Sequence, residues 1–210
     1  AGLLAGVVLF GGAALQQAGM VWTSAGKAGF ITGLYVVLVP LVGLFMRERA
    51  GWARWLAALL AAGGLFLLTV TRSFTLERGD LLVLIGALFW TAHVRLLGWL
   101  SPRTDPLALS CVQFAVCSLL SAVLAAFLEK VSAGAILAAG LPILYGGLLS
   151  VGVAYTLQVV AQRHAPPAHA AVLLSLETVF AALGGAILLD ERLPQLPSLP
   201  ESFTVLDTVL

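Results

Sequence analysis

Charged side chains are scarce in this 210-residue chain, in which Asp, Glu, Lys and Arg together make up 10% of the sequence. A soluble domain usually carries about 25% charged residues. The apolar fraction is 60% and the mean hydropathy is +1.05, which is more apolar surface than one globular core could enclose. The scarcity of charge therefore excludes a soluble globular fold and predicts an integral membrane protein.

Groups that would bind metals, phosphates or nucleic acids are also missing. The net charge is +1, and no basic patch predicts a nucleic-acid partner. With three His and two Cys, the chain has no metal-ligand spacing, and it has no phosphate-cradling glycine loop. We therefore expect no cofactor, no metal and no nucleic acid, with the lipid bilayer as the first partner.

Only two cysteines occur, Cys111 and Cys117, and both lie in one apolar run. Six residues apart on a helix, they point to different sides, so we expect no disulfide between them. We expect both to be small residues of the packed interior, where free cysteines are common.

Long apolar runs make up most of the chain, and each is continuous rather than alternating, which favours helices over a barrel. A helix needs about 20 residues to cross the hydrocarbon core. The predicted spans are 2–22, 28–46, 52–71, 80–100, 107–128, 141–162 and 168–189. The connections between them are short. The fold class is therefore all-α integral membrane, a helical bundle of about seven transmembrane helices.

Glycine and proline interrupt these spans at places that matter for packing. Small residues four apart let two membrane helices approach closely. Three pairs follow or approach this spacing: Gly2 and Gly6, Gly29 and Gly33, and Gly147 and Val151. Pro40 and Pro142 lie inside their spans, and each predicts a break or a kink in its helix.

The first two apolar runs return near the end of the chain, displaced by 142 residues (position 16 to position 158). In this alignment Gln16 meets Gln158, and Tyr35 meets Glu177. Each copy is the fifth apolar run after its original, and an offset of an odd number of crossings inverts the copy in the membrane. Inverted repeats are typical of secondary transporters, whose substrate sites lie near mid-membrane between the halves.

Three stretches resemble the drug/metabolite transporter superfamily, and specifically its EamA-type members, in order and spacing. They are Tyr35 to Pro40 with Arg47-Glu48-Arg49, Gly79-Asp80 leading to Ala87-Leu88-Phe89-Trp90, and Ala154-Tyr155 through Ser175-Leu176-Glu177 to Glu191-Arg192. The resemblance implies ten helices in an inverted five-plus-five repeat. It also implies a carrier of small metabolites, often amino acids or related compounds, commonly outward, with coupling to a proton or to solute exchange.

The repeat and the resemblance together divide the chain. We expect residues 1–71 to be the remainder of a first EamA-type repeat, residues 72–192 a second repeat, and residues 193–210 a Pro-rich tail that does not span the membrane. The repeat plan places two helices ahead of Ala1 and one after the second repeat. An inactive fragment that needs a partner chain is therefore the alternative to an active carrier, and a homodimer is another way to cover the unpaired helix faces.

Glu177 is the strongest candidate for the substrate or proton site. It lies about midway through the last predicted span, where an ionised acid costs about 2.5–3.5 kcal/mol on insertion scales. Such an acid normally faces a cavity or a partner, so we expect Glu177 to bind a proton or an amine. The structural alternative is a protonated acid that forms a hydrogen bond between helices.

Six further residues are candidates to line the same pocket. Trp90 and His93 are three residues apart and share a helix face, which predicts ring stacking and a titratable imidazole. The other candidates are Gln16, Gln158, Tyr35 and Tyr155. The structural alternatives are aromatic packing for the rings and interhelical hydrogen bonds for the amides, each worth about 0.6 kcal/mol.

An intramembrane enzyme that uses Ser150 and His93 is a further class. It would need a nucleophile beside a base with oxyanion donors around it, and no motif ties these two residues together. We therefore predict a secondary transporter of the plasma or inner membrane rather than an enzyme. We expect it to act on a small molecule by alternating access, with a proton as the candidate coupling ion.

Overall fold

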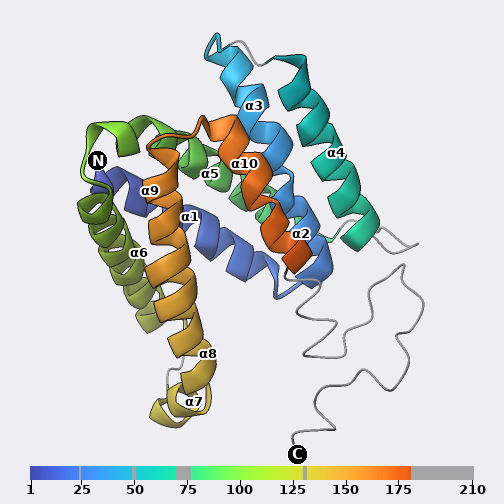
Figure 1. Cartoon of the computed structure of the whole chain (residues 1–210). Coiled ribbons are helices and arrows are strands. Elements are labelled where there is room, and N and C mark those ends of the chain that lie inside the picture. The colour runs from blue at the N-terminus through green and yellow to red at the C-terminus, as the bar shows by residue number, and fades with distance from the viewer. Residues whose placement is uncertain (24, 49–50, 70–76, 130–131, 181–210) are drawn as a thin grey trace, which may run out of the picture. The chain divides into compact units, whose positions relative to one another are not determined.

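The computed structural model describes residues 1–23, 25–48, 51–69, 77–129 and 132–180, and all regular elements within these ranges are helical (Figure 1). The α-helices are α1 (Gly2–Gly19), α2 (Ala25–Gly33), α3 (Tyr35–Phe45), α4 (Trp52–Thr69), α5 (Arg78–Leu100), α6 (Pro106–Leu128), α7 (Ala133–Ala138), α8 (Gly140–Leu144), α9 (Thr156–Gln162) and α10 (Pro167–Leu174). Two helices of other pitch are the 3₁₀-helix η1 (Ser101–Arg103) and the π-helix η2 (Tyr145–Tyr155).

Five helical stretches are long and apolar enough to cross a membrane. They are Gly2–Gly19, Lys27–Phe45, Arg78–Arg103, Pro106–Leu128 and Gly140–Gln162. Two shorter apolar helices, Trp55–Phe66 and Pro167–Phe180, fall on the remaining two predicted spans. The prediction of an all-α membrane bundle is therefore confirmed. The end of the last predicted span and the Pro-rich tail lie outside the described residues.

The chain forms two compact units. The first unit combines residues 1–14 with 89–167, and the second combines residues 15–88 with the segment from residue 168 onward. Helices α1 and α5 contribute to both units. The predicted repeat halves, 1–71 and 72–192, have other boundaries and stay a prediction.

In the first unit, α1 lies against α6 at two glycines, and α6 packs against α9. A methyl group added to Gly2 would lie 2.5 Å from Cβ of Val112, and one added to Gly6 would lie 2.6 Å from Cβ of Val116. The close approach predicted for this pair of glycines is therefore observed. The buried core beside it contains Ala5, Leu97, Leu100, Leu109 and Val159.

The stretch from α8 to α9 departs from regular α-helical geometry. Pro142 lies within α8 and has no N–H to donate to the preceding turn, and the wider π-helix η2 begins three residues later. Such π-helical turns are rare and are frequent at functional sites. The packing predicted for Gly147 is wrong, because a methyl group added there would meet nothing within 4 Å among the described residues.

In the second unit, α4 packs against α2 and α3 (Figure 1). A methyl group added to Gly33 of α2 would lie 2.6 Å from Leu65 of α4, whereas one added to Gly29 would make only an ordinary contact of 3.9 Å with Thr178. The rings of Phe30 and Phe66 meet edge to face, with their centroids 5.7 Å apart. The close approach predicted for Gly29 and Gly33 is therefore concentrated at Gly33.

The break in this unit lies at Leu34, between α2 and α3, and not at Pro40. Helix α3 continues through Pro40 to Phe45, so the predicted break at Pro40 is wrong. A proline within a helix removes one hydrogen bond, here the one to the carbonyl of Val36, and α3 tolerates that loss. At Leu34 the backbone N–H is shared between the carbonyls of Phe30 and Ile31, which marks the change between the two helices.

Candidate functional site

The first unit contains a partly open cavity of about 240 Å³. One wall is a single face of α6, formed by Phe114, Cys117, Ser118 and Ser121. Positions three, four and seven apart stack on one side of a helix, which explains why these four side chains meet. The result is a stripe of small hydroxyl and thiol groups within an otherwise apolar helix.

The facing walls come from three other helices. Leu9 and Ala13 belong to α1, Trp90 belongs to α5, and Val151 and Tyr155 belong to η2. No lining residue carries a formal charge at neutral pH. The cavity is therefore a mainly apolar space with three aromatic side chains, Trp90, Phe114 and Tyr155, and a few weakly polar groups.

The Trp90 ring contacts both α1 and η2. A methyl group added to Gly12 of α1 would lie 3.2 Å from Cε2 of Trp90, so the indole packs directly on the α1 backbone. The centroid of the Trp90 ring lies 6.2 Å from that of Tyr155 on η2, with 37° between the planes. Direct aromatic contacts have centroid separations of about 4.5–7 Å, so these two rings form one continuous wall. The structure thus brings two of the predicted site residues to one cavity.

His93 lies one turn further along α5 and is fully buried. Its ring meets Trp90 edge to face, with the centroids 6.2 Å apart, and its Nε2 lies 2.9 Å from Oε1 of Gln113 on α6. The other ring nitrogen, Nδ1, and the Gln113 amide nitrogen have no hydrogen-bond partner among the described residues. The hydrogen bond that the structure shows for the His93 side chain thus goes to Gln113 and not to Ser150.

Gln158 belongs to a chain of hydrogen bonds that ties α9 to α5. Its amide nitrogen donates to Oε1 of Gln162 at 3.2 Å, and the Gln162 amide nitrogen donates to the carbonyl of Val94 at 2.9 Å. Gln162 is buried, whereas Gln158 is half-buried. The bond that joins the two helices is made by Gln162, whereas the Gln158 bond lies within α9, so the role of Gln158 stays a prediction.

The remaining predicted residues belong to the second unit. Tyr35 is buried at the start of α3, and Gln16 is half-buried near the end of α1. Glu177 is exposed on the helical stretch that continues α10 toward Phe180. A single ring of polar groups that includes all seven predicted residues stays a prediction, because Glu177, Tyr35 and Gln16 lie in a different unit from the other four.

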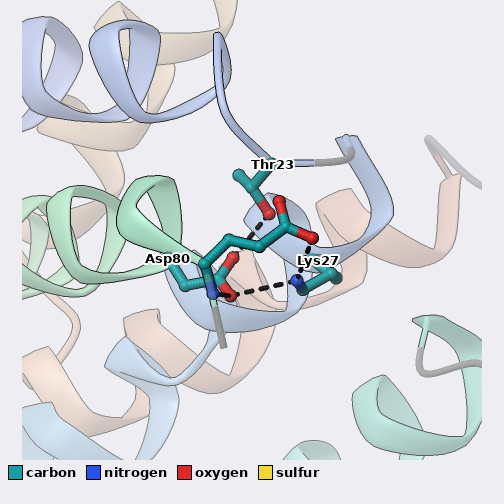
Figure 2. Close-up of polar contacts among 4 residues, drawn as sticks. Thr23, Lys27 and Asp80 are labelled. Carbon is teal, nitrogen blue, oxygen red and sulfur yellow. Dashed lines mark hydrogen bonds and ion pairs between the residues drawn. The ribbon is translucent and has the colours of Figure 1, made fainter. Parts of the chain in front are cut away.

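A second polar cluster, in the second unit, was not predicted from the sequence (Figure 2). Asp80, only 3% exposed, lies in the first turn of α5 and accepts hydrogen bonds from the Thr23 hydroxyl at 2.5 Å and the Glu77 backbone N–H at 2.8 Å. Lys27 at the start of α2 forms ion pairs with Asp80 at 3.0 Å and with Glu77 at 3.4 Å. The cluster joins the turn after α1 to the start of α5.

Backbone contact explains how these segments come so close. A methyl group added to Gly79 would overlap the carbonyl oxygen of Gly19 and would lie 2.9 Å from the carbonyl carbon of Trp22. Only glycine fits this approach, since backbone atoms cannot move aside as a flexible side chain can. Gly79 and Asp80 therefore act together. Gly79 allows the turn after α1 to approach α5 closely, and Asp80 binds that turn through a hydrogen bond from Thr23.

The α6 stripe of the first unit and the Asp80 cluster of the second unit are two features that the sequence did not reveal. The spacing of Phe114, Cys117, Ser118 and Ser121 was a usable signal, because small polar residues recur there on one face. Both cysteines are unbridged, as predicted, but Cys111 is exposed and Cys117 is half-buried. The expectation that both lie in the packed interior is therefore wrong for Cys111, because α6 exposes that side.

Comparison with known proteins gives two findings. Residues 77–196, more than half of the chain, match the EamA-like transporter family. The chain is also 33% identical over 196 residues to an uncharacterized transporter from Archaeoglobus fulgidus, a match that covers 91% of this chain and 62% of the relative. The chain thus spans less than two thirds of that relative's length. No solved structure matches the chain.

Proposed function

The chain belongs to the EamA-like transporter family, and we propose that it is a secondary transporter that moves a small metabolite, an amino acid or a related compound, out of the cell. The observation that supports this most is the cavity of the first unit, because all four helices that line it lie in segments long enough to cross a membrane. Secondary transporters bind their substrates at this kind of place, among helices near mid-membrane.

Alternating access is the proposed mechanism. In carriers built from inverted repeats, one half rocks against the other and opens a fixed site to one side of the membrane at a time. The repeat displaced by 142 residues, which pairs Gln16 with Gln158, supports this mode of action. The π-helix η2 supplies one wall of the cavity, and π-helical turns are frequent at functional sites.

Glu177 is the proposed carboxylate that binds a proton or the amino group of the substrate. An ionised acid that faces hydrocarbon at mid-membrane costs about 2.5–3.5 kcal/mol, so a proton or an ammonium group is its favoured partner. Competition between the two for one carboxylate would couple substrate movement to proton movement. His93 is the second titratable group of the proposal, since its Nδ1 is a buried nitrogen with no hydrogen-bond partner among the described residues.

Reconstitution of the purified chain into lipid vesicles tests this function. Vesicles filled with unlabelled amino acids should take up labelled amino acids by exchange, faster than vesicles without protein. Glu177→Gln should reduce this exchange to the rate of empty vesicles, because the amide cannot exchange a proton. Glu129→Gln is the matched control, since Glu129 is exposed at the end of α6 and should leave the rate unchanged. Normal exchange by Glu177→Gln would refute the role of Glu177, and no exchange by the unaltered chain would refute the transporter.

The proposed location is the plasma membrane, and the proposed assembly is a homodimer. Much of α6 exposes large apolar side chains, including Leu119, Val123 and Phe127, and such surface requires lipid or another helix. The mass of the purified chain in detergent, measured by light scattering with the detergent subtracted, distinguishes one copy from two.

A further inference from the structure

The chemistry of the first-unit cavity indicates what part of a substrate it can take. Its lining has no formal charge at neutral pH, and its polar groups there are limited to hydroxyl, thiol, indole and phenol. An ammonium or carboxylate group entering this space would lose its hydration without gaining a partner of opposite charge, which is strongly unfavourable. A sugar would bury several hydroxyls against apolar carbon. The cavity therefore selects against charged and polyhydroxylated groups.

The size of the cavity and its aromatic wall further restrict which substrate groups can bind in it. An apolar cavity of about 150 Å³ is sufficient to bind benzene, and this one measures about 240 Å³. The space suits one ring or two fused rings. Trp90 and Tyr155, with centroids 6.2 Å apart, lie too close for a third ring to enter between them. A flat guest would instead lie against the wall that the two rings form together.

We propose that this cavity binds the planar apolar part of the transported molecule, a single aromatic ring or a fused pair of rings such as indole. Trp90 and Tyr155 supply the ring contacts, and Ser118 and Ser121 supply hydrogen bonds to a ring N–H or hydroxyl. The proposal rests on the proposed transport function, since it names the substrate class of that same site. Any charged group of the substrate must then be recognised outside this cavity.

The reactivity of the Cys117 thiol can report whether the cavity is occupied. The chain contains two cysteines, and only Cys117 lines the cavity, whereas Cys111 lies six residues earlier on an exposed side of α6. The substitution Cys111→Ser leaves a full-length chain with one thiol at the proposed site. A guest in the cavity should cover this thiol and slow its alkylation.

The test measures the alkylation rate of Cys117 by N-ethylmaleimide in the purified Cys111→Ser chain, with and without added probes. Millimolar indole should slow alkylation at least about threefold, the factor expected when two thirds of the sites are occupied. Glucose and glutamate at the same concentration should have no effect. Equal rates with and without indole, or protection by glutamate as strong as that by indole, would overturn the proposal.

A pair of variants makes the test specific to the aromatic wall. Trp90→Phe in the Cys111→Ser chain should retain part of the protection by indole, and Trp90→Ala should remove it. The converse chain, Cys117→Ser with Cys111 retained, should be alkylated at the same rate with and without indole. If Trp90→Ala fails to fold, Tyr155→Leu replaces it, and full protection in a folded variant that lacks one ring would contradict the proposed wall.

The result is separable from the transport assay. Protection of Cys117 by indole in a chain that exchanges no solute would uphold the cavity and refute the proposed function. Exchange of amino acids without protection would refute the cavity as the ring-binding site and leave the transport function standing.

Discussion

Two buried polar clusters of the molecule differ in how completely their polar groups are hydrogen-bonded. Asp80 of the second unit accepts two hydrogen bonds and forms an ion pair with Lys27. His93 and Gln113 of the first unit share one hydrogen bond, and each has a nitrogen without a partner among the described residues. A buried carboxylate whose oxygens are hydrogen-bonded and ion-paired holds segments together, whereas a buried polar atom without a hydrogen-bond partner calls for an explanation, of which a ligand is one. We infer that the Asp80 cluster is structural and that the His93 region is functional.

The largest effect on stability is expected at Asp80. Asp80→Asn removes the carboxylate nearer to Lys27, whose side chain is 14% exposed, and leaves the longer ion pair with Glu77. Removing one partner of a buried ion pair is strongly destabilising, and the remaining Glu77 reduces the loss here. The variant should melt at a lower temperature in detergent, while the exchange rate per folded molecule stays normal.

Lys27→Met added to Asp80→Asn should recover part of the lost stability, because it removes a positive charge that has lost its nearer carboxylate. Glu77→Gln is the matched control, and its exposed pair should contribute little to stability. A folded Asp80→Asn chain that is stable but transports nothing would reverse the assignment of this cluster.

A smaller effect is expected where the same cluster depends on backbone contact. Gly79→Ala would place a methyl group against the Gly19 carbonyl and the backbone of Trp22, at an overpacking cost of about 1–3 kcal/mol. Gly63→Ala meets nothing within 4 Å among the described residues and should instead stabilise α4 by up to about 1 kcal/mol. Thermal melting of both variants side by side checks the difference. Equal melting temperatures would show that the turn after α1 moves to accommodate the added methyl group.

The smallest change in stability is expected when both members of the His93–Gln113 pair are replaced, together with a large change in function. His93→Leu alone should cost about 1–3 kcal/mol, because Gln113 then lacks its partner. The double substitution with Gln113→Leu should be nearly neutral, since both polar groups are gone. Exchange should be reduced in both variants and should lose its dependence on an imposed pH gradient. A double variant that transports normally with the same gradient dependence would make the pair structural, like the Asp80 cluster.

The sequence predicted the helical spans and several contacts within them, because these depend on local pattern. The seven apolar runs correspond to helical segments, and the spacing of Gly2 and Gly6 predicted where α1 meets α6. The contact between Trp90 and His93 was predicted because residues three apart lie on the same face of a helix. Features of this kind can be predicted from the periodicity of a single helix.

Contacts between helices distant in sequence could not be predicted in the same way. Asp80 meets Thr23 and Lys27 across more than fifty residues, and the Gly79-Asp80 sequence alone does not indicate which turn it binds. The π-helix at Tyr145–Tyr155 brings Tyr155 to Trp90, and the α-helical period assumed for that span does not predict it. The break at Leu34 was likewise not predicted, because Pro40 was the more obvious candidate for a break in that span.

The central claim is that this chain carries a small molecule through a site that needs Glu177. Exchange of labelled tryptophan, which joins an amino-acid backbone to an indole ring, tests this most directly in vesicles with matched amounts of the unaltered chain and of Glu177→Gln. The account predicts rapid exchange by the unaltered chain and the rate of empty vesicles for the variant. Equal exchange by the two chains, or none by either, would contradict it.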